Sequence, residues 1–179
     1  MGTIVGVRLT DGVALAADKR ATGGSTVRSE SVEKLFAFDG AEAGAVAADE
    51  TGAIQTFGRK LDTEVRQRGT EQGSLIRIDP LSRLASELAA DTGVEAVVAA
   101  RDGEGVARMR AIDSAGAELD EKVVAQGTGA QFALGQLDGM DRDESIDGAA
   151  DALGSIFERI AERDTETGED CTVWTLPDG

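Results

Sequence analysis

The chain has 179 residues, and its 34 acidic residues against 18 basic ones give a formal net charge of -16 at pH 7. This charge excludes nucleic acid as a partner, because binding it needs a basic stripe. The lack of His and the single Cys exclude His-based triads, most zinc sites and an internal disulfide, so we expect no cofactor and no metal.

Four short apolar segments in the first fifty residues have the length and alternation of β-strands. They cover residues 3–9, 13–18, 33–38 and 43–49. Asp11-Gly12 separates the first two segments and Asp39-Gly40 the last two, and Asp-Gly pairs are strong turn signals. The sequence therefore predicts two β-hairpins in this region.

Two helices are predicted next, because apolar residues recur at helical spacing. They cover residues 50–69 and 74–93, with Asp79-Pro80 as a suitable start for the second. Three further strands, then two helices and a last strand, complete the chain. These elements cover residues 94–101, 106–113, 122–127, 127–139, 143–164 and 170–176.

The order of these elements decides the fold class. Strands and helices come in blocks rather than in alternation, which is typical of an α+β fold. The simplest layering packs two antiparallel sheets face to face, with a helix pair on each outer face. At this length we expect one domain over residues 1–179, with Trp174 and all five Phe in its core.

Five segments, taken together and in order, resemble the β-type subunits of the proteasome, which are N-terminal nucleophile hydrolases. The segments are TIVGVRLTDGVALAADKRAT, VEKLFAF, AGAVAAD, GTGAQFALGQL and RDTETGEDCTVWTL. The resemblance runs from residue 2 to about residue 176 and is more specific than any one segment. It implies a four-layer αββα sandwich of two antiparallel sheets, in agreement with the layering expected from element order.

The resemblance also implies a set of site residues. In this family an N-terminal Thr attacks the peptide carbonyl, and its free amino group acts as the base. Asp18 and Lys34 match the family's Asp and Lys beside that nucleophile. Thr128, Asp164 and Thr167 match a Ser-Asp-Ser set that holds the amino terminus, with Thr for Ser at two positions.

Lys34 has two interpretations. In a strand of apolar neighbours it is either an exposed edge charge or half of a buried ion pair with Asp18. We expect the buried pair, which is a hint of function because two charges removed from water must be well paired. Cys171, with apolar and acidic neighbours, is expected to be an inert thiol rather than a nucleophile.

The position of the nucleophile itself holds Gly2, and Thr3 falls on the second residue of the family's mature chain. We expect removal of the initiator Met, which leaves an amino group at Gly2 but no hydroxyl. Thr3 could replace the nucleophile only after cleavage before it, and a one-residue shift in a strand turns a side chain to the other face. The family's oxyanion amide is expected near Gly44 or Ala45.

These patterns predict a divergent proteasome β-like protein without ordinary peptidase activity. Its role would be structural or peptide-binding, in a homo-oligomer or with other proteasome-type subunits. The alternative is an active hydrolase, a peptidase or acyl transferase, that uses Thr3 after processing and acts on peptides or unfolded protein.

The setting of the protein is predicted from charge and from what the N-terminus lacks. No signal peptide and no apolar run of roughly 20 residues is visible in the sequence, so we expect a cytoplasmic protein without a membrane partner. An acidic surface spread along the chain is typical of a high-salt cytoplasm, since salt screens its self-repulsion. The alternative is an acidic protein from an ordinary cytoplasm.

Overall fold

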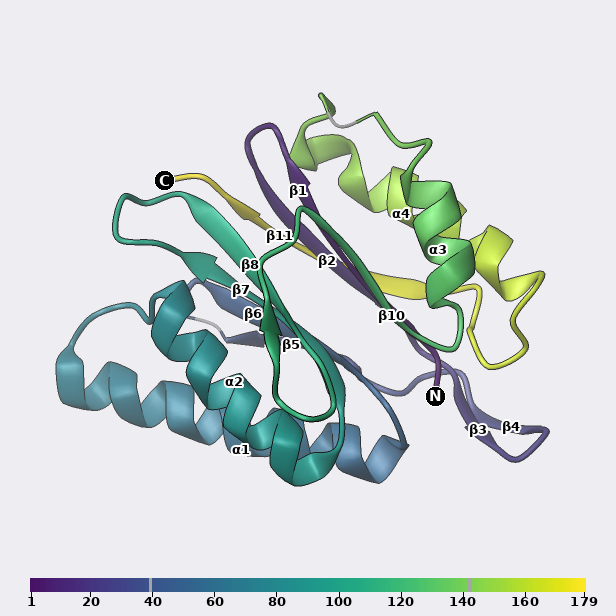
Figure 1. Cartoon of the computed structure of the whole chain (residues 1–179), viewed down its shortest axis with the longest axis horizontal. Helices are drawn as coiled ribbons and strands as arrows, with labels where there is room; N and C mark the ends of the chain where they lie inside the picture. Colours follow the sequence, from purple (N-terminus) through teal and green to yellow (C-terminus); the bar gives the residue numbers. More distant parts are fainter. Residues whose placement is uncertain (39, 142) are drawn as a thin grey trace.

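Two antiparallel β-sheets pack face to face, and a pair of helices covers the outer face of each (Figure 1). The computed structural model describes residues 1–38, 40–141 and 143–179. Asp39, in one of the predicted turns, lies outside these residues. The four layers confirm the predicted αββα sandwich and the α+β class.

The strands form a four-stranded sheet, a five-stranded sheet and a small separate hairpin. The first sheet has the order β10-β1-β2-β11, from Val123–Gly127, Thr3–Leu9, Gly12–Asp18 and Cys171–Pro177. The second has the order β5-β6-β7-β8-β9, from Leu35–Phe38, Ala43–Ala48, Glu95–Arg101, Ala107–Ile112 and Glu118–Leu119. The hairpin pairs β3 (Ala21–Gly23) with β4 (Thr26–Ser29).

The helices lie in the two outer layers. They are α1 (Thr51–Gln72), α2 (Ile78–Thr92), α3 (Ala130–Leu137) and α4 (Ala149–Ala161), the last preceded by the short 3-10 helix η1 (Ile146–Gly148). Gly73 and Gly93 end the first two helices in the left-handed conformation that glycine adopts without strain. None of the described helices combines the length and the apolarity needed to cross a membrane.

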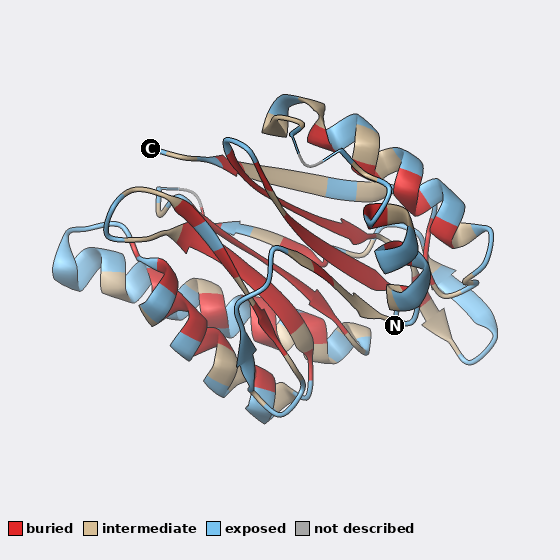
Figure 2. Ribbon diagram, turned by 45° about the horizontal axis from the view of Figure 1, so that its top comes forward, coloured by how far each residue is buried: buried red, intermediate tan, exposed pale blue. Residues whose placement is uncertain are grey.

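Side-chain alternation along the central strands explains the layers. In β2, Leu15 packs between the two sheets, whereas Ala14 and Ala16 pack against the α3–α4 layer. Both faces of β2 are therefore buried, and the strand is apolar at every position before Asp18 (Figure 2). This is the pattern expected of a strand that is covered on both sides.

Some expectations differ from the structure at the edges of elements. Lys34 lies just before β5 rather than inside it, and the hairpin β3–β4 and the two-residue strand β9 carry no clear sequence signal. The prediction that Phe132 lies in the core is wrong, because this residue of α3 is 43% exposed. Trp174 is half-buried between the sheets.

Candidate active site

Gly2 lies directly before β1, where the sequence predicted the nucleophile position. Its φ of 85° is in the left-handed region, which a β-branched residue such as Thr rarely adopts. A Cβ atom on Gly2 would run into Lys34 Nζ and Asp18 Oδ1. The space that a side chain would need at this position is thus filled by the two charged groups beside it.

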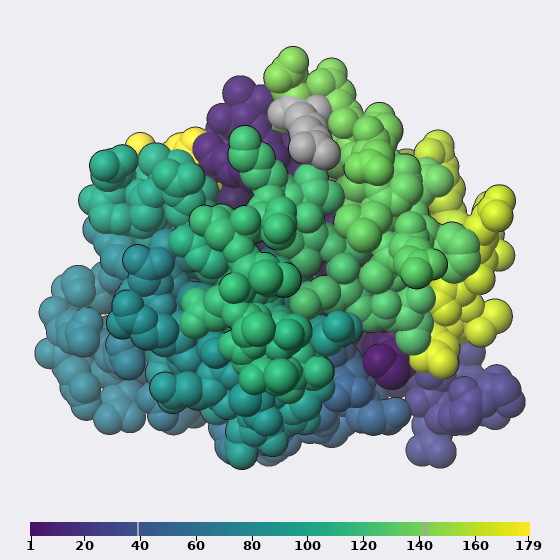
Figure 3. Space-filling model, viewed as in Figure 1, coloured from purple at the N-terminus to yellow at the C-terminus, as the bar shows by residue number. Residues whose placement is uncertain are grey.

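The N-terminus reaches the surface where several distant segments meet. Figure 3 shows it in dark purple between the violet-blue β3–β4 hairpin, the green α3 region and the yellow C-terminal part. The Met1 ammonium group pairs with Glu166 at 3.1 Å, and Lys34 Nζ donates to the Met1 carbonyl at 3.3 Å. The first residue is therefore held from two sides.

Lys34 and Asp18 form a buried ion pair, as predicted. The Nζ–Oδ1 distance is 2.8 Å, and the two side chains are 1% and 0% exposed. Asp18 ends β2 in one sheet, whereas Lys34 comes just before β5 in the other. The pair therefore joins the two sheets next to Gly2.

The Asp18 carboxylate accepts hydrogen bonds from four donors. Oδ1 accepts from Lys34 Nζ and from the Thr3 amide at 2.9 Å, and Oδ2 accepts from the amides of Arg20 and Gly168, both at 2.9 Å. A carboxylate has about four lone-pair sites, so its acceptor capacity is used in full. Asp18 thereby ties the start of β1 to two loops.

Thr128, Asp164 and Thr167 come together as the resemblance implied. Asp164 Oδ2 accepts from the hydroxyls of Thr128 and Thr167, both at 2.6 Å. The Thr128 amide donates to the Gly2 carbonyl at 2.9 Å. Thr128 thus links this cluster of three residues to the Gly2 carbonyl, whereas the Lys34–Asp18 pair lies where a side chain of Gly2 would be.

The Thr3 side chain is fully buried and already engaged. Its hydroxyl accepts from the Gly129 amide at 3.0 Å and lies 2.6 Å from the Thr167 hydroxyl. Because the hydroxyl hydrogen of Thr167 goes to Asp164, Thr3 is the donor to Thr167. The Thr3 hydroxyl thus faces the helix layer, away from Lys34, as the alternation of strand side chains requires.

Gly44 and Ala45, near which the oxyanion amide is expected, do not pair with Lys34 in the strand register, and an oxyanion role at this position stays a prediction. Both residues lie inside β6, opposite Ala37 and Phe36, and the Trp174 ring packs on Gly44. The strand residue beside Lys34 is Ala47, whose amide donates to the Lys34 carbonyl at 3.0 Å. Sequence spacing alone could not fix this register. Residues 43–48 are all apolar and mostly small, so no residue among them marks a position in the strand.

Cys171 lies opposite Asp18 in the pairing of β11 with β2. Burial, the largest cause, and the carboxylates of Asp170 and Asp18 together raise the pKa of its thiol to about 11. The thiol is therefore protonated at neutral pH, which agrees with the expectation of an inert cysteine.

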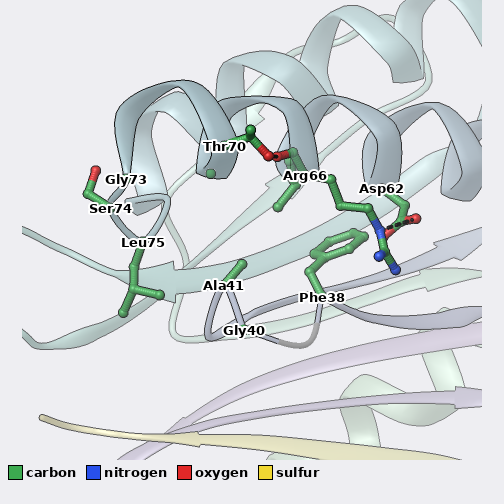
Figure 4. A pocket seen from close by; sticks show the side chains of 11 residues that line it. Phe38, Gly40, Ala41, Asp62, Arg66, Thr70, Gly73, Ser74 and Leu75 are labelled. Atoms are coloured by element: carbon green, nitrogen blue, oxygen red, sulfur yellow. Dashed lines mark hydrogen bonds and ion pairs between the residues drawn. The ribbon is translucent and has the colours of Figure 1, made fainter.

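A hollow of about 720 Å³ lies elsewhere, at the C-terminal end of α1 (Figure 4). Phe38, Val65 and Leu75 contribute apolar lining, and the ion pair of Arg66 with Asp62 also lines the hollow. No residue of the Gly2 site lines it.

Comparison with known proteins agrees with this geometry. Residues 1–176 match the family described as Proteasome subunit. The chain is 36% identical over 181 residues to Proteasome subunit beta 1 of Thermococcus gammatolerans, which covers 96% of this chain and 87% of that protein. It is 29% identical over 180 residues to Proteasome subunit beta of Halorubrum lacusprofundi, with 98% and 73% covered. It is 30% identical over 171 residues to Proteasome subunit beta of Halobacterium salinarum, with 93% and 70% covered. The chain therefore belongs to the proteasome subunit family, and the relatives it resembles are named as β subunits.

Proposed function

We propose that this chain is a β-type proteasome subunit that lacks the hydrolytic nucleophile and acts structurally, or by binding peptides, in an oligomer. The observation that carries the proposal is Gly2 itself: a residue without a side chain stands beside a buried Lys34–Asp18 pair. Its φ of 85° and the close approach of both charged groups leave no room for a Thr side chain in this conformation.

Neither Thr3 nor Cys171 is placed to supply the missing hydroxyl or thiol nucleophile. Thr3 is buried and uses its hydroxyl in two hydrogen bonds on the opposite face of the strand. The Cys171 thiol has a pKa of about 11 and is protonated at neutral pH. Both observations support an inactive subunit.

The other site residues form hydrogen bonds that stabilise the fold whether or not the site is catalytic. Asp18 bonds to three backbone amides besides Lys34, and Asp164 bonds to two hydroxyls. Losing either carboxylate would leave buried or half-buried donors without partners. This explains how the set can persist in a subunit that does not cut peptides.

The partners and the setting are part of the same proposal. We infer that the chain forms one domain that assembles with copies of itself or with other proteasome-type subunits in the cytoplasm. A high-salt cytoplasm is supported by the net charge of -16 and by relatives from Halorubrum and Halobacterium.

The alternative function is an active hydrolase that uses Thr3 after cleavage of the Gly2–Thr3 bond. Thr3 would then have to move by about 3.3 Å along the strand and turn to the opposite face. The move would break the hydrogen bond from the Thr3 amide to Asp18 and the two hydrogen bonds of the Thr3 hydroxyl. Nothing in the geometry favours this rearrangement.

The test is hydrolysis of a short fluorogenic peptide and of unfolded casein in concentrated KCl. We expect no turnover by the natural chain or by the isosteric variant Thr3→Val. Turnover by the natural chain that is lost in a folded Thr3→Val protein would overturn the proposal. Thr3→Ser, which keeps the hydroxyl, is the matched control for that loss.

A further inference from the structure

Among the described helices, only α3 (Ala130–Leu137) has no charged residue, although 29% of the chain is charged. The helix lies within residues 123–137, which form the longest uncharged run of the sequence. Phe132 is nevertheless 43% exposed on it. Copies with a net charge of -16 repel each other least across an uncharged surface, so α3 offers a second copy the least electrostatic resistance.

A second hollow, of about 300 Å³, lies between α3 and α4, which run side by side over the four-stranded sheet (Figure 1). Most of its lining is small or apolar, from Gly135, Gly139, Met140, Ala152 and Ile156. Gln136 also lines it, and Phe132 comes one turn earlier on the same side of α3. Phe132 and the lining of this hollow together form what we term the α3–α4 surface.

Three charged residues line this hollow, and they lie at its opposite ends. The two helices run antiparallel, so Asp141 and Glu144, which follow α3 and precede α4, lie at one end. Arg159, in the last turn of α4, lies toward the other end and donates to Gln136 at 2.9 Å. Within the part of the chain that the structure describes, none of the three forms an ion pair. The surface therefore has an acidic end and a basic end.

The other charged residues nearby preserve this difference between the two ends. Residues 138–144, at the acidic end, contain four acidic residues and one basic residue, Arg142, which lies outside the described residues. Arg163 follows Arg159 by about one turn and adds to the basic end, while Asp164 is already bonded to two threonine hydroxyls. The remaining acidic residues of α4 and its end are exposed about a quarter turn away from the hollow, and they are Asp151, Glu158 and Glu162.

The opposite charges make the α3–α4 surface complementary to itself. A twofold axis through the middle of the surface places the acidic end of each copy on the basic end of the other, and uncharged residues meet in between. A partner of a single charge sign would be attracted at one end and repelled at the other. The charge pattern therefore favours a second copy of this chain.

We propose that the α3–α4 surface binds the same surface of a second copy across a twofold axis. Phe132 of each copy then packs over the hollow of the other, and Arg159 faces the partner's Asp141. Buried aromatic side chains supply most of the affinity of such a contact, whereas the charged ends set its direction. The inference rests on the part of the proposed function in which the chain assembles with copies of itself.

The first arm of the test measures mass by sedimentation in concentrated KCl, where salt screens the carboxylates around the surface. Phe132→Ser is expected to weaken association about a hundredfold. The mass should then fall to half at a concentration where the natural chain is fully associated, because a twofold contact joins copies in pairs. Leu134→Ser is the matched control, since Leu134 is 40% exposed on the opposite side of α3 and its loss should leave the mass unchanged.

The second arm reverses charges at the lowest KCl concentration at which the natural chain associates. Arg159→Asp and Asp141→Arg are each expected to weaken association about tenfold, since each brings like charges together across the axis. The double variant restores opposite charges and should associate like the natural chain. Asp141→Arg also makes the net charge less negative, so general repulsion alone predicts stronger association for this variant.

The outcomes separate this contact from assembly in general. Unchanged mass in a folded Phe132→Ser protein would overturn the proposed contact but leave assembly through another surface intact. A natural chain that stays monomeric at every KCl concentration would overturn both the contact and the assembly in the proposed function. Stronger association of Asp141→Arg, or no recovery in the double variant, would contradict the twofold arrangement of the two copies.

Discussion

Asp18 and Lys34 form one buried pair, but the two residues have unequal bonding. Replacing Lys34 leaves a carboxylate that still accepts from the amides of Thr3, Arg20 and Gly168. Replacing Asp18 leaves three amides without an acceptor and leaves the Lys34 ammonium group with only the Met1 carbonyl at 3.3 Å. Breaking a buried pair typically costs about 3–5 kcal/mol, and we place Asp18→Ala at the upper end of that range.

This asymmetry predicts that Asp18→Ala lowers the free energy of unfolding more than Lys34→Met does. Denaturant unfolding in concentrated KCl measures both variants. The double variant tests the coupling, because Lys34→Met should cost less once Asp18 is already absent. Equal losses for the two single variants, or additive losses in the double variant, would mean that the carboxylate is not the centre of this network.

Thr3 offers a second prediction at this scale. Thr3→Val keeps the shape of the side chain but leaves the Gly129 amide and the Thr167 hydroxyl short of a partner. We expect a loss of about 1–3 kcal/mol in the free energy of unfolding. Thr172→Val, at an exposed position on β11, is the control and should have little effect. A Thr3→Val protein as stable as the natural chain would contradict the buried hydroxyl network.

At the scale of elements, the end of β11 is fastened by Asp178. Its carboxylate accepts two bonds from the Arg8 guanidinium at 2.8 Å and one from the Ala107 amide at 2.8 Å. Arg8, the larger cause, and the Ala107 amide hold the pKa of Asp178 below its ordinary value. A carboxyl group with a lowered folded pKa adds stability above its unfolded pKa of about 3.9 and loses it as the pH falls through the folded value.

We therefore expect Asp178→Asn to lower stability by about 1 kcal/mol at neutral pH, a modest amount because the pair is partly exposed. The difference from the natural chain should shrink as the pH falls below about 4. Thermal unfolding across that pH range measures it. Glu64→Gln, at an exposed position on α1, makes the same change in charge and should show no such trend. A difference that stays constant with pH would rule out this ion pair as its cause.

The sequence predicted the elements whose signals are local. Alternation and Asp-Gly turns located β1 and β2, and helical spacing located all four helices to within several residues. Asp18 and Lys34 were paired from the resemblance, and the structure confirms the contact. The position of Lys34 before β5 and the pairing of Gly44 with Ala37 were not predicted, because both depend on the register of β5 and β6 within the five-stranded sheet.

Exposure was the least predictable property of the elements. Phe132 lies in an apolar helix but on its outer side. The position of β11 at the edge of the described four-stranded sheet likewise has no signal in the sequence, because an apolar strand has the same residue pattern at an edge as in the centre of a sheet. Only the strand order of the sheet separates the two cases.

At the scale of the whole molecule, the net charge of -16 is the dominant property. Self-repulsion opposes the compact state and the approach of copies. Salt shortens the screening length from about 10 Å at 0.1 M to about 3 Å at 1 M. We expect both the midpoint of thermal unfolding and the oligomer mass in analytical ultracentrifugation to rise over this range of KCl. A midpoint that is flat or falls with salt would contradict a protein suited to a high-salt cytoplasm.

The central claim is that a proteasome-family fold here surrounds a position without a nucleophile. The most direct measurement is the intact mass of the purified protein in concentrated KCl, before and after incubation with a peptide electrophile that captures N-terminal threonine. The account predicts a chain that retains Gly2 and gains no adduct. A chain that begins at Thr3 and gains one adduct there would contradict it.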